Sequence, residues 1–92
     1  MSVDLATVTI NACNNAGRNC GSASVRVTMT GAATGATVSA STIPSNLTVT
    51  QTAASGGVYT FLITAKNNTR TTNTLTFTGT SCGPQDVTVK TK

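Results

Sequence analysis

The chain lacks the groups on which catalysis near neutral pH usually depends. It contains no histidine, and its two carboxylates, Asp4 and Asp86, are separated by most of the 92-residue sequence. General acid–base catalysis commonly needs a group that titrates near neutrality, or two carboxylates in one pocket. No nucleophile has an evident base, and no glycine-rich loop precedes a helix. We therefore expect a protein that is not an enzyme and that binds no cofactor.

Long apolar runs, runs of like charge and metal-ligand spacings are also missing. No segment approaches the roughly 20 apolar residues of a membrane-spanning helix, and there is neither a histidine nor a CxxC pair for zinc. The net charge of +4 is spread along the chain, which permits attraction to acidic partners but is poor evidence for nucleic-acid binding. The N-terminal segment, MSVDLATVTI, has none of the features of a secretory signal. With Met1 as the natural start, we expect synthesis in the cytoplasm. Because apolar spans and basic runs are missing, we expect neither a membrane nor a nucleic acid as a partner.

What the chain does contain is a regular alternation of apolar and hydroxyl residues, clearest between positions 56 and 79. Successive side chains of a strand point to opposite faces, so this pattern gives each strand one apolar face. Threonine, which supplies most of the other face, is β-branched and favours strands. The alternation in this region predicts two strands at the centre of the core. The side chains expected to be buried are Tyr59, Phe61, Ile63, Leu75 and Phe77.

Turn-forming residues divide the rest of the chain into further short strands. Together with the central pair, the expected strands are Val3–Ile10, Ser22–Thr30, Ala36–Thr42, Leu47–Gln51 and a last strand that contains Val87 and Val89 and ends at Lys92. The expected turns are Gly31–Gly35, Ala53–Gly57 and Ser81–Gln85, with Gly56 and Gly57 able to take positive φ in a hairpin. Two facing sheets are the simplest way to bury the apolar faces, so we predict one β-sandwich domain over residues 1–92.

Two details of this pattern refine the prediction. The phase of the alternation slips near Ala6 and Thr7, which indicates either a bulge or a strand that changes sheets. Ile43 follows the third strand and is expected to close the core beside Val38.

The strand count and the threonine-rich alternation resemble immunoglobulin-like domains of bacteria and phages. The likeness is best in the C-terminal half, NLTVTQTAASGGVYTFLITAKNNTRTTNTLTFTGTSCGPQDVTVKTK, which is similar in style to the small bacterial sandwiches called BACON domains. The chain departs from the antibody type because it has no tryptophan and its tyrosine lies on the fifth strand. The resemblance implies an all-β, immunoglobulin-like antiparallel β-sandwich of about seven strands, with a structural or adhesive role.

Free-standing domains of this kind are familiar as phage decorations, so the leading hypothesis is a capsid decoration or cement protein on the surface of a tailed-phage virion. Its partner would be the major capsid protein or another acidic protein or polymer surface, and it could form a homo-oligomer. The alternative is an adhesion or spacer module of a bacterial surface protein, secreted or at the cell surface, that binds a cell-surface polymer. A third hypothesis, an ice-binding threonine face, is less suited to a twisted sheet.

The three cysteines, Cys13, Cys20 and Cys82, leave an odd thiol whatever pairing occurs. If neighbouring strands alternate in direction, Cys13 and Cys20 lie together in the first loop and Cys82 lies at the opposite end. A strand of about eight residues spans roughly 26 Å, which is beyond the reach of a disulfide. We predict that only Cys13 and Cys20 can pair, and three reduced cysteines remain equally open for a protein in a reducing cell.

The same alternation of strand direction predicts where the charges lie. One end of the sandwich should carry five cations, and the two aspartates should lie towards the other end. The predicted basic end is a candidate docking surface for an acidic partner, while the alternative is that its charges only keep the protein soluble. Its residues are Arg18, Lys66, Arg70, Lys90 and Lys92.

Overall fold

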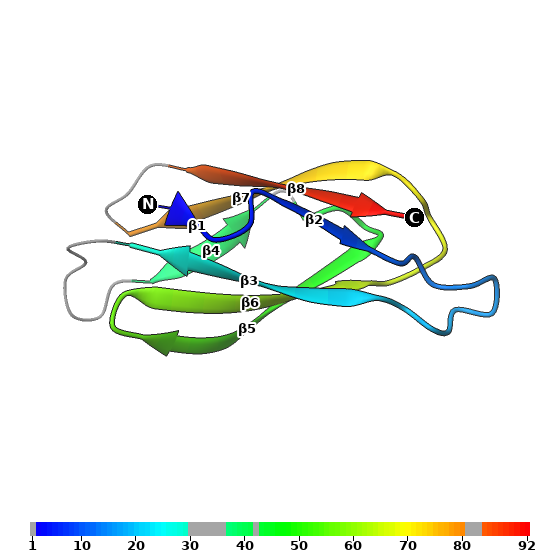
Figure 1. Cartoon of the computed structure of the whole chain (residues 1–92), viewed down its shortest axis with the longest axis horizontal. Helices are drawn as coiled ribbons and strands as arrows, with labels where there is room; N and C mark the ends of the chain where they lie inside the picture. Colours follow the sequence, from blue (N-terminus) through cyan, green and yellow to red (C-terminus); the bar gives the residue numbers. More distant parts are fainter. Residues whose placement is uncertain (1, 30–36, 42, 81–83) are drawn as a thin grey trace.

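The computed structural model describes residues 2–29, 37–41, 43–80 and 84–92 as two facing β-sheets of four strands each (Figure 1). This part of the chain contains strands and turns and no helix, and therefore no helix that could span a membrane. The strands are β1 (Ser2–Val3), β2 (Thr7–Ile10), β3 (Ser22–Thr28), β4 (Val38–Ser41), β5 (Leu47–Ser55), β6 (Val58–Ala65), β7 (Thr72–Gly79) and β8 (Gln85–Thr91).

One sheet has the strand order β1-β3-β6-β5, and the other has the order β2-β8-β7-β4. The strands run along the long axis of an elongated molecule that measures 44 × 19 × 19 Å (Figure 1). Alternate residues of β6 are buried, as the period-two pattern predicts, because they face the second sheet. The predicted all-β sandwich is therefore confirmed.

The core joins the two sheets through an aromatic pair at its centre. Phe61 of β6 and Phe77 of β7 have ring centroids 4.8 Å apart and tilted by 45°, a geometry that adds about 0.5–1.5 kcal/mol beyond area burial. Tyr59, Ile63 and Leu75 are buried beside them, as the alternation predicts. The core also contains Val8, Ile10, Val25, Val27, Met29, Val38, Val87 and Val89.

The first expected strand changes sheets, which is one of the two outcomes that the phase slip allowed. β1 pairs antiparallel with β3 in one sheet, and β2 pairs with β8 in the other. The β2–β8 pair is parallel, with Thr7 opposite Thr88 and Ile10 opposite Thr91. The expectation of a wholly antiparallel sandwich is wrong at this pair. The chain keeps its direction as it passes from β1, which pairs with β3, to β2 in the facing sheet. There β2 lies beside β8, which runs in the same direction.

Two local expectations are also corrected. β5 continues to Ser55, because Ala53 and Ala54 pair with Thr60 and Tyr59 after a bulge between Gln51 and Ala53. Only Gly56 and Gly57 form the turn, with φ of 58° and 82°. Ile43 is 45% exposed and does not close the core. The expected turn over Gly31–Gly35 and the free thiol of Cys82 lie outside the described residues.

Candidate docking surface

Three segments that are distant in the sequence meet at one end of the sandwich. They are the loop 11–21 after β2, the connection 66–71 between β6 and β7, and the end of β8 (Figure 1). The Cys13 N–H donates to the Asn67 carbonyl at 2.9 Å, and the Ala12 N–H donates to the Lys92 carbonyl at 2.9 Å. The Asn68 amide also donates to Asn15 Oδ1 at 3.1 Å. These bonds bring together the five cations predicted to share one end: Arg18, Lys66, Arg70, Lys90 and Lys92.

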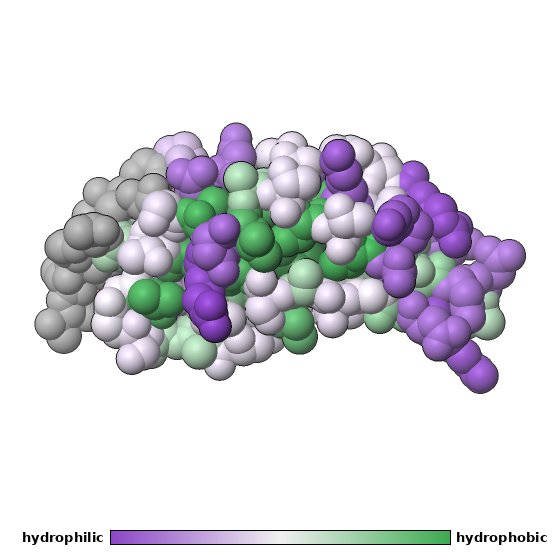
Figure 2. Space-filling model, viewed as in Figure 1, coloured by the Kyte–Doolittle hydropathy of each residue, from purple (hydrophilic) through white to green (hydrophobic). Residues whose placement is uncertain are grey.

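We call this end the basic pole, and its cationic side chains are exposed. All five of its cationic residues are exposed, and no ion pair joins them to an acidic group within the described ranges. Figure 2 shows strongly hydrophilic side chains gathered at this end of the molecule. The sixth cation, Arg26, lies along β3, away from the pole.

The two aspartates lie away from the basic pole and are engaged in local hydrogen bonds. Asp4 Oδ1 accepts from the Arg26 N–H at 2.8 Å in the link between β1 and β2. Asp86, near the start of β8, accepts from the Thr76 hydroxyl at 2.9 Å. The separation of the two signs of charge along the long axis therefore agrees with the arrangement expected from strand direction.

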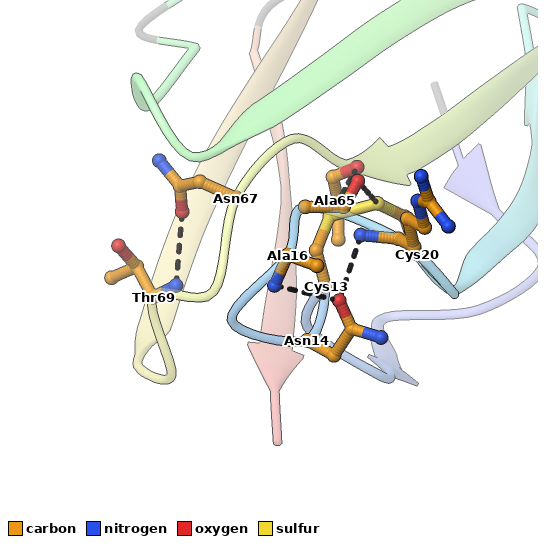
Figure 3. The surroundings of a disulfide bond; sticks show 9 residues. Cys13, Asn14, Ala16, Cys20, Ala65, Asn67 and Thr69 are labelled. Carbon is orange, nitrogen blue, oxygen red and sulfur yellow. Dashed lines mark hydrogen bonds between the residues drawn. A yellow bond between two sulfur atoms is a disulfide. The ribbon is translucent and has the colours of Figure 1, made fainter.

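The loop that carries Arg18 is closed by a disulfide and by an asparagine side chain (Figure 3). Cys13, which is completely buried, is bonded to the exposed Cys20 with an S–S distance of 1.98 Å. Asn14 Oδ1 accepts from the backbone N–H groups of Ala16 at 3.0 Å and Arg18 at 2.9 Å. The backbone at Arg18 is thus held against a loop that is itself anchored in the core.

The connection that carries Arg70 is fixed by Thr91, a buried hydroxyl residue at the end of β8. Thr91 Oγ1 accepts from the Thr71 N–H at 2.9 Å and lies 2.9 Å from the Thr69 carbonyl, to which it can donate. Asn67 Oδ1 accepts from the Thr69 N–H at 2.9 Å, which tightens the same turn. Arg70 therefore projects from a segment that is pinned on both sides.

The backbone of Lys66 is held by a second buried polar residue, Asn46, whose burial the sequence pattern did not predict. Asn46 is 5% exposed, its carbonyl accepts from the Lys66 N–H at 2.9 Å, and its Oδ1 accepts from the Asn73 amide at 3.2 Å. Its Nδ2 has no partner in the described structure. Asn46 and Thr91 appear in the sequence as ordinary turn and strand residues, so only the packing of the loops against the sheets identifies them.

This arrangement of exposed cations is suited to long-range attraction of anions. No group of three histidine, cysteine, aspartate or glutamate residues comes together within the described residues. All three aromatic side chains of the chain are buried, so none can stack on a sugar or a base. Comparison of the chain with known protein families, curated proteins and solved structures found no match.

Proposed function

We propose that this protein is a non-enzymatic structural domain that docks through its basic pole on an acidic surface. The observation that carries the proposal is the concentration of five of the six cations at one end of the sandwich, with both aspartates elsewhere. The molecule measures 19 Å along each of its two short axes, little more than two Debye lengths of about 8 Å at physiological ionic strength. Charges so close together act jointly on an approaching anionic surface, which favours encounter and orientation.

The strand order supports the immunoglobulin type that we propose for the fold. In the constant-type arrangement, the first, second, fifth and fourth strands form one sheet, and the third, sixth and seventh form the other. The orders β1-β3-β6-β5 and β2-β8-β7-β4 follow this scheme if β1 and β2 are counted as one divided strand. Because many unrelated functions share this fold, the strand order supports the fold type alone.

The setting that we propose is the outer surface of a tailed-phage capsid, where the partner is the major capsid protein. This setting follows from the sequence resemblance, and the basic pole is compatible with it. Surface charge pairs are individually worth only about 0.2–1 kcal/mol. If copies of the protein are joined as a homo-oligomer, they engage several equivalent acidic sites of a repeating shell at once, and linkage then strengthens the weak individual contacts.

One observation favours the alternative, a spacer or adhesion module of a bacterial surface protein. The two ends of the chain lie towards opposite ends of the long axis (Figure 1). Domains joined through such termini extend end to end, as a spacer requires. In that setting the acidic partner of the basic pole would be a cell-surface polymer.

Binding measurements on charge variants test the proposal. The double variant Lys66→Glu, Arg70→Glu should bind a polyglutamate-coated surface about tenfold more weakly than the unmodified chain, a change of about 1.4 kcal/mol, and the difference should shrink as salt is raised. Arg70→Gln and Arg26→Gln are the matched pair, because both remove one arginine charge and only Arg70 belongs to the pole. Equal binding by these two variants would refute docking through the pole.

A second measurement separates the two settings. The unmodified chain should co-sediment with purified tailed-phage capsids that lack their decoration protein, and Lys66→Glu, Arg70→Glu should reduce that co-sedimentation. Binding to the acidic polymer without binding to capsids would support docking through the basic pole and would refute the proposal that the partner is a capsid protein.

A further inference from the structure

β5 gives this sandwich a long open edge. It is the last strand of its sheet, and the structure describes no strand beyond it. It spans nine residues, whereas the other edge strands described, β1, β2 and β4, span two, four and four. Edge strands usually carry lysine, proline or another device that prevents pairing with a further strand. β5, LTVTQTAAS, contains no charge and no proline, and most of it is exposed. Its bulge lies between Gln51 and Ala53, so the edge is a regular strand from Leu47 to Gln51.

The hydrogen bonds on both sides of β6 show which backbone groups of β5 face outwards. Ala65 donates its N–H to Gly21, on the β3 side, and Lys66 donates to Asn46, on the β5 side, at 3.0 and 2.9 Å. Alternation along β6 therefore directs Leu62 and Thr64 towards β5, where they lie opposite Thr50 and Thr48. In β5, Val49 and Gln51 alternate with Thr48 and Thr50. Their N–H and C=O groups must therefore face away from β6.

We propose that β5 pairs antiparallel with β5 of a second copy of this chain, with Thr50 on the two-fold axis. In this register Val49 of each copy lies opposite Gln51 of the other, and their outward backbone groups satisfy one another. The regular segment Val49–Gln51 is self-complementary in this arrangement. Thr50 meets Thr50 within the regular part of the strand, and threonine pairs across strands are favourable. Thr48 lies near Thr52, where the bulge ends the regular pairing. The β1-β3-β6-β5 sheets of the two copies then form one continuous sheet with closed two-fold symmetry.

The distribution of charge allows a second copy to occupy this edge. Antiparallel pairing directs the two basic poles to opposite ends of the dimer. Lys66 pairs with Asn46, four residues from the axis at Thr50, which is about 13 Å along a strand. The two Lys66 residues then stand about 27 Å apart, more than three Debye lengths of about 8 Å. A net charge of +4 on each copy therefore does not oppose the pairing strongly.

Cysteine cross-linking tests this register. Thr50→Cys and Thr48→Cys are made in the full chain with Cys82→Ser, and each is incubated with oxidised glutathione so that the Cys13–Cys20 bond is preserved. Residues directly opposite in a non-hydrogen-bonded pair have Cα atoms about 4.5 Å apart, within disulfide range. Two copies of Thr48→Cys hold their thiols about 13 Å apart along the strands. Thr50→Cys should form disulfide-linked dimers at least tenfold faster than Thr48→Cys.

Equal rates for the two cysteine variants would indicate random collision and overturn the proposal. An independent measurement uses sedimentation of the chain with native β5 sequence from about 10 µM to about 1 mM, a range that covers weak association. The chain should dimerise within this range, and Thr50→Lys, which places two ammonium groups directly opposite each other, should abolish the dimer. Thr48→Lys, whose lysine lies near Thr52, should weaken it less. A chain that stays monomeric throughout would refute the pairing.

Discussion

The isoleucines at positions 43 and 63 offer a matched test of where the core ends. Ile63 in β6 is 0% exposed, and Ile43, which precedes β5, is 45% exposed. Truncation of a fully buried isoleucine to alanine costs about 2–5 kcal/mol, because burial is lost and a cavity remains. Full burial of such a side chain is worth about 1.5–3 kcal/mol. The half-exposed side chain of Ile43 gains roughly half of that free energy from burial, and its truncation leaves no closed cavity. Ile43→Ala should therefore cost about 1 kcal/mol or less.

Urea denaturation with the disulfide kept oxidised measures this difference directly. For a slope of about 1–2 kcal/mol per molar, a loss of about 3 kcal/mol lowers the midpoint by about 1.5–3 M for Ile63→Ala. The midpoint for Ile43→Ala should fall by about 1 M at most. If Ile63→Ala leaves too little folded protein, Ile63→Val should still cost about 0.5–1.5 kcal/mol. Equal midpoints for the two alanine variants would place Ile43 in the core and refute the burial argument.

Two further pairs of substitutions test how the ends of the sandwich are held. Thr91→Val keeps the shape of the side chain but removes the buried hydroxyl that bonds Thr71, and it should cost about 1–3 kcal/mol. Thr88 is only partly buried, so Thr88→Val should change the free energy of unfolding by less than Thr91→Val does, and equal thermal shifts would contradict this assignment. Gly56→Ala, with φ of +58° and open space, should cost about 1–2 kcal/mol. Gly57→Ala should cost more, since its Cβ would lie 2.9 Å from the Met29 carbonyl oxygen, and equal midpoints in urea would argue against that contact.

The sequence predicts the central strands well because their burial depends on local alternation. Phe61 and Phe77 lie where period two places them, and the phase slip marks the change of sheets between β1 and β2. Ile43 is exposed because it lies in the passage from one sheet to the other, where hydrophobicity alone does not decide burial. Ala53 and Ala54 form strand because they pair with β6 across a tight hairpin, although alanine has little preference for strands.

The candidate site is predictable in outline and unpredictable in detail. Strand direction alone places Arg18 and Lys66 at the same end, because each of the seven expected strands runs opposite to the one before it. The supporting bonds made by Asn46 and Thr91 depend on how loops pack against the ends of the sheets. No local pattern in the sequence carries that information.

The parallel pairing of β2 with β8 has a mechanical consequence. The chain enters β2 from one end of the molecule and leaves β8 at the other. Tension applied between the two termini therefore pulls these neighbouring strands in opposite directions along their length. The ladder from Thr7–Thr88 to Ile10–Thr91 is loaded in shear, so its bonds must yield together, whereas a hairpin pulled open from one end would lose them one after another.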